Sequence, residues 1–439
     1  MFVALGARRG AIDPAKRAAS SAPCRECVVF PAMEHRTTVR PRRGPDRLVV
    51  SFSDIEMGAG GRFDDFPRSD FLAEVIRGYG RVPYRWLSVD LVFNGDTFDL
   101  LKTSFRDGYP HHVTREIALA KMARIADHHR EFFRGLREFL DEDPERRSAT
   151  FIVGNHDMEL FFPEVQALVR ERIGSRDGRV EFPGLSTSIG RLHVEHGSQH
   201  DPLFQIDPSE PFVTGRSGDK ILNLSWAAVA LLDVAIPLQP LLYHHDRLKP
   251  KELVLELVPE VRELLTNQFW TYWTRHYWRA FLDGDDPLKK VSWTMLRELV
   301  RRLAVQDVDV DMGQDLLALV TKSDEYDVRV LGHQHEPGWW SHGGRKVLRT
   351  GCLRDEFALE AGGAVQVPLN KTWAEIYLRE DEVVRSHLVE AAAPSRPAET
   401  MPESIFEVVP QLQALLGSPS ARDGEHAAQR RQEAREGAP

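Results

Sequence analysis

Five short runs of β-branched and large apolar residues, each closed by a turn, place the tightest limit on the fold of this chain. The runs lie at 48–53, 89–94, 150–153, 192–195 and 328–331. Runs of this length and composition are typical of β-strands. The segment from about Val113 to Leu140 separates the second run from the third, and its apolar residues recur near helical spacing. Because strands that alternate with helices pack in layers, the sequence predicts an α/β fold.

Each of the five runs leads into polar residues that can bind metal ions. In chain order these residues are Asp54, Asp96, Asn155, His156, His196, His333 and His335. In α/β sheets, ligands gather at the carboxyl ends of the strands. Carboxylate, amide and imidazole groups bind divalent ions such as Mn, Fe, Zn and Mg. One such residue alone is more often a turn or surface residue, but the ordered set predicts a metal site with enough ligands for two ions.

These polar residues belong to motifs that resemble those of the calcineurin-like metallophosphoesterase superfamily. That superfamily carries D-x-H, G-D-x-x-D, G-N-H-D, a His often followed by Gly, and G-H-x-H. The matching segments here are Asp54–Glu56, Gly95–Asp99, Gly154–Asp157, His196–Gly197 and Gly332–His335. The resemblance covers about residues 47–204 and 326–385. It implies a metallophosphoesterase-like four-layer α/β/β/α sandwich with a helical insertion, and a metallophosphoesterase activity.

The resemblance also implies a centre of two divalent metal ions. Asp96 would bridge the ions, which could be Mn, Fe, Zn or Mg, with Mn favoured. The ligands of one ion would be Asp54, Glu56 and His335, and those of the other would be Asn155, His196 and His333. Such ions clamp phosphate oxygens and activate a water molecule for attack on phosphorus. The implied function is the hydrolysis of a phosphomonoester, phosphodiester or pyrophosphate.

The G-N-H-D motif also carries the residues implied in catalysis. His156 would stand over the substrate phosphate and stabilise or protonate the leaving group, and Asp157 would orient the ring of His156. Asp99 is expected to be an outer or turn residue rather than a ligand. Cys352 has no evident basic partner in the sequence, so we interpret it as structural.

Position 56 departs from the superfamily pattern, because Glu56 stands where a histidine is usual. If Glu56 binds a metal ion, it adds a negative charge and favours harder ions such as Mn or Mg. If it points away, that metal position lacks a ligand, and a non-catalytic metal-binding scaffold becomes the alternative. We expect retained activity, because every other ligand position is filled.

The rest of the 439 residues divides around the motifs. We predict a flexible N-terminal arm at 1–46, a catalytic domain at 47–204 and 326–392, a helical insertion at 205–325, and a mostly disordered tail at 393–439. The arm holds a lone C-x-x-C, Cys24 and Cys27, which is a weak metal or redox signal. The tail holds one short amphipathic stretch, Ile405–Leu416.

The insertion contains two unusual segments. Ile221–Tyr243 is strongly apolar, but polar residues and prolines interrupt it, so we predict a buried helix pair broken at Pro237 and Pro240 rather than a membrane span. The aromatic run Phe269–Trp278 is predicted to pack in the core. A cap over the metal site, a dimer surface and a membrane contact stay open for it. A cap of this kind would suit a bulky or lipid-linked phosphoester.

Charge and cysteine content bear on partners and location. The formal net charge of -9 counts against a nuclease-type phosphodiesterase, although basic residues on the predicted helix keep that alternative open. They are Arg124, Arg130, Arg134 and Arg137. Three cysteines indicate a reducing compartment, and no secretory signal is apparent. The expected partner is a phosphorylated small molecule or a lipid-linked substrate, in the cytoplasm, with membrane association left open and no oligomeric state predicted.

Overall fold

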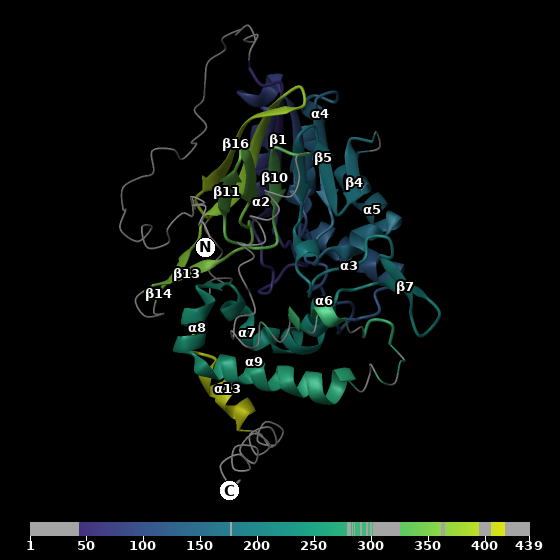
Figure 1. Ribbon diagram of the computed structural model, residues 1–439, viewed down its shortest axis with the longest axis vertical. Coiled ribbons are helices and arrows are strands. Elements are labelled where there is room, and N and C mark those ends of the chain that lie inside the picture. The colour runs from purple at the N-terminus through teal and green to yellow at the C-terminus, as the bar shows by residue number, and fades with distance from the viewer. Residues whose placement is uncertain are drawn as a thin grey trace, which may run out of the picture.

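A six-stranded sheet and a five-stranded sheet form the centre of the molecule (Figure 1). The computed structural model describes residues 44–175, 178–278, 325–360, 365–394 and 405–417, with scattered positions between 282 and 301. The six-stranded sheet has the order β16-β15-β1-β2-β3-β4. Its strands are β16 Glu382–Ala391, β15 Lys371–Arg379, β1 Arg47–Phe52, β2 Ser88–Asn94, β3 Arg147–Ile152 and β4 Val180–Gly184. The first four strands in the chain run parallel, and β15 and β16 are antiparallel additions.

The five-stranded sheet has the order β11-β12-β10-β6-β5. Its strands are β11 Gly338–His342, β12 Arg345–Arg349, β10 Val328–Leu331, β6 Leu192–Glu195 and β5 Ser186–Ile189. The three central strands are parallel, and β11 and β5 flank them as antiparallel partners. All five strands predicted from the sequence are therefore confirmed, as β1, β2, β3, β6 and β10.

Alternation along the strands sends side chains to two different cores. Along β1, Leu48, Val50 and Phe52 join the core under the helices, while Val49 joins a second core. This second core holds Val92 and Ile152 of the six-stranded sheet together with residues of the other sheet, such as Val194 and Val330. The two sheets therefore pack against each other, since successive side chains of a strand point to opposite faces.

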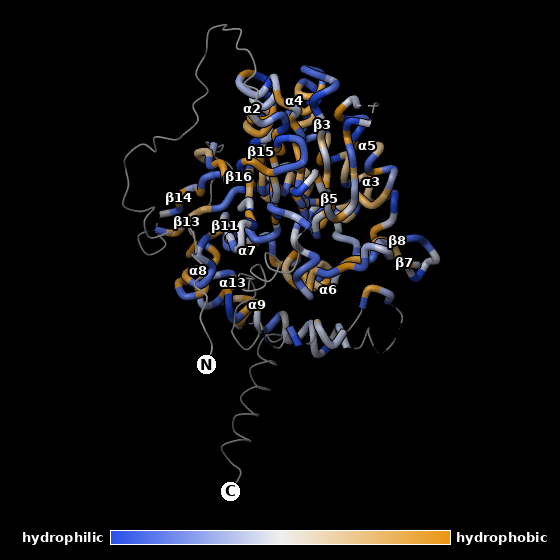
Figure 2. The backbone as a smooth tube through the Cα atoms, turned by 45° about the horizontal axis from the view of Figure 1, so that its top comes forward, coloured by the Kyte–Doolittle hydropathy of each residue, from blue (hydrophilic) through white to orange (hydrophobic). Residues whose placement is uncertain are grey.

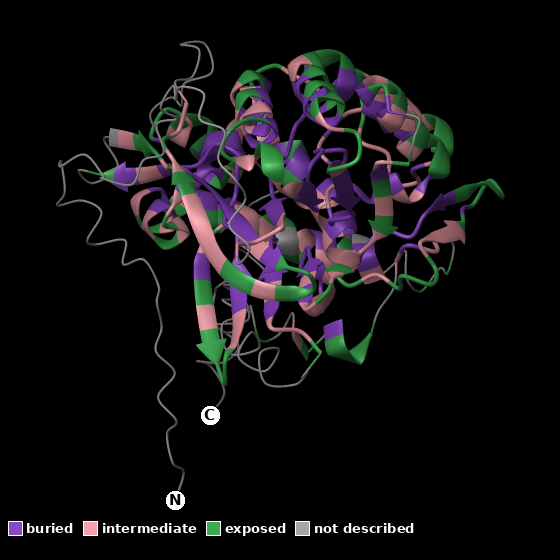
Figure 3. Ribbon diagram, turned by 90° about the horizontal axis from the view of Figure 1, so that it is seen from above, coloured by how far each residue is buried: buried purple, intermediate pink, exposed green. Residues whose placement is uncertain are grey.

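Four helices cover the other face of the six-stranded sheet. They are α2 Ser69–Gly80, α3 Arg115–His128, α4 Arg130–Glu142 and α5 Pro163–Ile173. Their inner faces are buried and their outer faces are exposed (Figure 3). The predicted segment from Val113 to Leu140 is helical, but as two helices that meet at His129. The fully buried ring of His129 contacts the carbonyl oxygen of Gly58 and the carboxylate of Asp64, both at 3.0 Å. The expected α/β class is confirmed.

The apolar segment of the insertion differs from its prediction. Trp226–Asp246 is one continuous helical stretch rather than a pair broken at prolines. It consists of α6 Trp226–Ala230, a π turn Leu231–Ala235, a 3-10 turn Ile236–Leu238 and α7 Gln239–Asp246. Proline lacks an amide hydrogen, and both prolines stand in the first turn of a new helical type, where that hydrogen is not needed.

By length and composition, Trp226–Asp246 is also the one helix among the described residues that could cross a membrane, with 21 residues and a mean hydropathy of 1.5. A single such helix is a weak indication, because core helices of soluble proteins share these properties. Apart from its last residue, Asp246, this helix contains one acidic residue, Asp233. The carboxylate of Asp233 lies 2.6 Å from Lys289 and 3.0 Å from His111. The chain therefore neutralises the charge in the middle of this helix.

A third core lies below the sheets (Figures 1 and 2). Its side chains come from α7, α8 Lys251–Leu257, α9 Pro259–Thr271, α13 Val409–Leu416, β9 Leu248–Lys249 and β13 Phe357–Glu360. The strand β14 Val365–Pro368 pairs with β13, the π turn Tyr272–Tyr277 follows α9, and the hairpin β7 Phe212–Thr214 and β8 Lys220–Leu222 packs against the core under the helices. Within the amphipathic stretch predicted in the tail, Val409–Leu416 is helical, and its buried Leu412 packs in the third core. In the aromatic run, Tyr272 and Tyr277 are buried as predicted, whereas Trp270 is 49% exposed. Cys24, Cys27 and most of both predicted flexible ends lie outside the described residues.

Candidate metal centre

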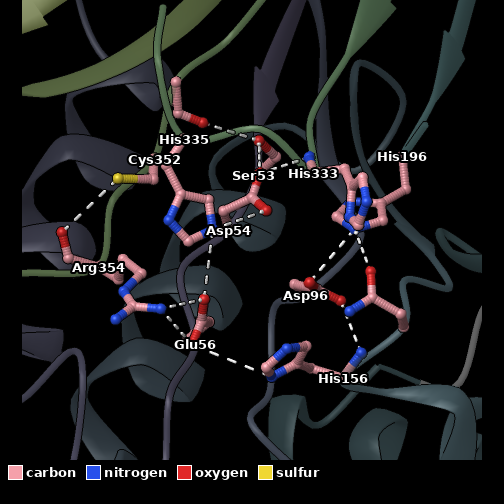
Figure 4. A network of polar contacts seen from close by, with 12 residues as sticks. Ser53, Asp54, Glu56, Asp96, His156, His196, His333, His335, Cys352 and Arg354 are labelled. Carbon is pink, nitrogen blue, oxygen red and sulfur yellow. Dashed lines mark hydrogen bonds and ion pairs between the residues drawn. The ribbon is translucent and has the colours of Figure 1, made fainter. Parts of the chain in front are cut away.

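The predicted metal ligands come together where the parallel strands end. Figure 4 shows side chains from both sheets turned toward one another across the gap between the strand ends. Ligand atoms of Asp96, His196 and His333 all lie within 4.8 Å of one another, so these residues could hold a metal ion. The carboxyl ends of parallel strands form the natural place for such a cluster. The site divides into two groups with different surroundings.

The Asp96 group consists of Asp96, Asn155, His196 and His333. The Nδ1 atom of His196 lies 2.9 Å from the carbonyl oxygen of Asn94, so this nitrogen donates a proton there. The Nε2 atom then faces Asp96 Oδ2 and Asn155 Oδ1, each at 3.2 Å. A free lone pair that faces two oxygen atoms is repelled by them, so this nitrogen must either carry a proton or bind a metal ion. The group therefore has the chemistry and the orientation of a metal site.

Electrostatics support the same interpretation of the Asp96 group. Burial alone would raise the pKa of Asp96, but His196 and His156 outweigh it and hold the pKa below its usual range. Burial alone would lower the pKa of His196, but the carboxylate of Asp96 outweighs it and raises the pKa to about 9. Both shifts show that the carboxylates give this group an excess of negative charge, which attracts a cation.

The Asp54 group consists of Asp54, Glu56 and His335. The Nδ1 atom of His335 lies 2.7 Å from Glu356, which leaves Nε2 facing Asp54 Oδ1 at 3.6 Å and Glu56 Oε1 at 3.5 Å. Asp54 is fully buried, and its Oδ1 has no hydrogen-bond partner among the described residues. An unsatisfied buried carboxylate oxygen is costly, so it fits a cation that the chain itself does not supply.

Glu56 is the exception in this group, because the chain neutralises it. Its carboxylate lies 3.0 Å from the guanidinium of Arg354 and 2.6 Å from the ammonium of Lys102, and all three side chains are buried or nearly so. Burial alone would raise the pKa of Glu56, but Arg354 and Lys102 outweigh it and hold the pKa well below its usual range. Glu56 thus points into the site and is ionised, but it is already paired.

His156 lies beside the metal ligands, as predicted. Its Nδ1 atom contacts Asp99 Oδ1 at 3.0 Å, and its backbone amide donates to Asp96. The contact that we expected of Asp157 is therefore made by Asp99. The oxygens of Asp157 instead accept the backbone amides of Thr97 at 2.8 Å and Gly154 at 2.7 Å, and these bonds tie the second and third strand ends together.

The charge around the ring of His156 favours its protonated form. Burial alone would lower the pKa of His156, but Asp96, Glu56 and Asp99 outweigh it and raise the pKa to about 10. An imidazolium at this position is a proton donor, which is the form that a leaving group requires.

The backbone holds the site in an uncommon conformation. Among the described non-glycine residues, φ is positive at six, and four of these are Asp54, Glu56, Asp96 and His333, with values of 50°, 55°, 50° and 68°. Left-handed backbone costs about 1–3 kcal/mol at residues other than glycine. Such strain at four residues of one site indicates that their placement serves a function rather than stability.

Two motif glycines explain why the ligands can approach so closely. A Cβ atom on Gly154 would lie 2.1 Å from Asp96 Oδ1, and one on Gly95 would lie 2.4 Å from the ring of His196. Real side chains do not approach this closely, so any residue larger than glycine would push a ligand away. The glycines of G-D and G-N-H-D are thus part of the site.

Three residues outside the motif analysis also shape the site: Arg354 and Lys102, which pair with Glu56, and Glu356, which fixes the ring of His335. Arg354 lies 298 residues from Glu56 in the chain, so no local spacing marks the contact.

Cys352 is buried, and burial, followed by Glu356, raises the pKa of its thiol well above its usual range, which fits the structural role we predicted.

Three of the four basic residues named for the nuclease alternative, Arg124, Arg134 and Arg137, contact groups of the chain itself. Arg134 pairs with Glu131, and Arg137 donates to the carbonyl oxygen of Ile173 at 2.6 Å. Arg124 donates to the carbonyl oxygen of Ser104. These contacts favour a solvated helix face over a phosphate-binding one.

Neither a scan against protein-family models nor a search of curated proteins finds a match for this chain.

Proposed function

We propose that this chain is a metal-dependent phosphoesterase, similar to the calcineurin-like enzymes, that hydrolyses a phosphomonoester, phosphodiester or pyrophosphate. One observation carries the proposal. Two imidazoles, His196 and His335, each donate through Nδ1 to an outer acceptor and turn Nε2 toward buried carboxylates. This outer support, which fixes the ring and its free nitrogen, is typical of metal-binding histidines.

The four-layer α/β/β/α sandwich is part of this proposal. Two sheets in contact and helices on the outer face of the six-stranded sheet support three of the layers. A helical layer on the outer face of the five-stranded sheet is the remaining expectation.

Bound divalent ions, with Mn favoured, would activate water and stabilise charge on the phosphate oxygens. The chain's own groups then have separate tasks. His156 donates the proton that the departing oxygen needs, and Asp99 holds the ring through Nδ1 so that Nε2 faces the substrate. Asp157 keeps the two strand ends together through backbone amides. Because these groups are buried or nearly so, each interaction is stronger than it would be in bulk water.

The substrate class extends the proposal. We infer a phosphorylated small molecule or a lipid-linked substrate, and a cytoplasmic enzyme that can contact a membrane. The apolar helix Trp226–Asp246 supports a bulky, apolar substrate, because its last residue, Asp246, contacts Arg354 beside Glu56.

The test is hydrolysis of a generic aryl phosphomonoester and an aryl phosphodiester by the full chain, loaded in turn with Mn, Fe, Zn and Mg. We expect turnover with at least one ion and none in the Asp96→Asn variant. Inactivity of the parent with all four ions on both substrates would count against an enzyme.

A non-catalytic metal-binding scaffold is the second candidate, and the ion pairs of Glu56 favour it. A carboxylate that is neutralised by Arg354 and Lys102 is a weaker ligand than the usual histidine. Metal binding without turnover on any phosphoester of a broad panel would identify this function.

A further inference from the structure

The replacement of histidine by Glu56 comes with two cations. The guanidinium Nη1 of Arg354 lies 3.0 Å from Glu56 Oε1 and 3.2 Å from Oε2, and Lys102 Nζ lies 2.6 Å from Oε2. Glu56 is 1% exposed and Arg354 is 4% exposed. The superfamily's histidine would be neutral and would offer a free nitrogen. Here a charged ligand and its counter-charges occupy the same position.

The two groups of ligands differ in this respect. Within the described part of the chain, no lysine or arginine side chain contacts the carboxylate of Asp96 or of Asp54, so these carboxylates remain available to a metal ion. A divalent ion at Glu56 Oε1 would instead lie close to both Arg354 and Lys102. In a buried site, like charges at such distances repel strongly because little water screens them.

The cations are firmly held from the other side as well. Arg354 Nη2 lies 2.7 Å from Asp246, the last residue of α7, and Lys102 Nζ lies 2.5 Å from Asp65 and 3.0 Å from Asp99. Their displacement by a metal ion would therefore break several ion pairs at once. Because α7 belongs to the insertion, the insertion takes part in fixing the charge next to the metal site.

We infer that the metal centre is asymmetric. The Asp96 group forms the tight metal position, and the Asp54 group forms a weak, exchangeable one, because Arg354 and Lys102 compete with a metal ion for Glu56. This inference rests on the proposed metal centre and adds the order and the strength of its loading.

The test measures metal content and affinity in the full-length protein rather than activity. Chelator-stripped protein is loaded with excess Mn²⁺ and dialysed, and the retained Mn is determined by mass spectrometry of the elements. We expect one Mn per chain. Calorimetric titration of this one-metal protein should show a second binding step that is about 10- to 100-fold weaker.

Two variants remove the competing cations one at a time. Arg354→Gln and Lys102→Gln should each tighten the second step by about tenfold or more and leave the first step unchanged. Arg147→Gln is the matched control, because Arg147 is 2% exposed but donates to backbone carbonyls away from the site. If one variant fails to fold, the other and the titration of the parent still decide.

The outcomes separate this inference from the proposed function. Two Mn ions retained by the parent with equal affinity would overturn the asymmetry and leave the phosphoesterase proposal intact. A weak second step that neither variant tightens would overturn the role of Arg354 and Lys102. A parent that binds no Mn, Fe, Zn or Mg would remove the metal centre itself.

Electron paramagnetic resonance gives an independent readout on the parent. With one equivalent of Mn²⁺, the spectrum should be that of an isolated ion, and coupling between two ions should appear only at a large excess. Coupled spectra at one equivalent would contradict the inferred loading order.

Discussion

The strand ends hold buried carboxylates and the insertion holds a partly buried one, Asp233, but the chain surrounds them differently. In the insertion, Asp233 lies 2.6 Å from Lys289 and 3.0 Å from His111, and Lys289 also contacts the hydroxyl of Tyr272. At the strand ends, Asp54 Oδ1 has no hydrogen-bond partner among the described residues, and no lysine or arginine side chain in the described part of the chain contacts the carboxylate of Asp96. A carboxylate that the chain neutralises supports the fold, whereas one that it leaves uncompensated is suited to an outside cation.

The strongest test of this contrast is the removal of one uncompensated charge. Asp96→Asn should abolish metal retention and reduce phosphoester hydrolysis to background, a larger effect than the loss of any single proton donor. The reason is that Asn supplies no charge to balance a divalent ion. Elemental analysis and the aryl phosphate assays measure the two effects. Full activity in this variant would refute the importance of the strand-end charge.

His156→Asn should lower kcat by about 10²–10⁴-fold, because it removes a general acid. Metal content should stay at the parent level, since His156 is not a ligand in this proposal. Asp99→Asn should lower kcat less, because the ring would lose only its support. Equal loss of metal and rate in His156→Asn would show that the ring holds the metal instead.

Gly154→Ala should destabilise the protein by about 1–3 kcal/mol, since the new methyl group must displace Asp96. Urea denaturation measures the stability, and elemental analysis should show reduced metal content. Gly108→Ala is the control, because nothing lies within 4 Å of its Cβ position. If Gly154→Ala leaves the stability unchanged, the strand ends can accommodate the extra methyl group without moving Asp96.

The smallest expected effect concerns Asp233, the carboxylate that Lys289 and His111 neutralise in the insertion. Burial alone would raise the pKa of Asp233, but His111 and Lys289 outweigh it and hold the pKa at about 2. A lowered pKa stabilises the folded state above the ordinary value of 3.8, and this contribution is lost as the pH falls from about 4 to 2.

Asp233→Asn should therefore cost about 1–2 kcal/mol near pH 6 and almost nothing at pH 2, as measured by urea denaturation across that range. Its metal content should equal that of the parent. A constant difference at all pH values would assign the loss to packing instead of charge.

The sequence predicts the strands and the convergence of the ligands well, because both depend on local patterns. A run such as 328–331 carries its own β signal, and motif order places its histidines at the strand end. The α/β class follows from the same alternation. These features need no knowledge of distant contacts.

Contacts between distant segments escape such reasoning. Glu56 meets Arg354 across 298 residues and Lys102 across 46 residues, and neither spacing has a recurrent pattern. The contact of Asp99 with His156 depends on the conformations of the two loops that carry them. The four-residue motif Gly154–Asp157 does not specify these conformations. The predicted break at Pro237 and Pro240 is wrong, because π and 3-10 turns accommodate both prolines within the continuous helix Trp226–Asp246.

The left-handed backbone at Asp54, Glu56, Asp96 and His333 affects what directed evolution of this protein would select. Selection for heat resistance alone rewards the relief of strain, and glycine adopts this conformation more readily than aspartate, glutamate or histidine. Such a selection should enrich replacements at these four positions and yield hardier proteins that have lost their metal. The most stable sequence for this fold and the functional one are therefore different sequences.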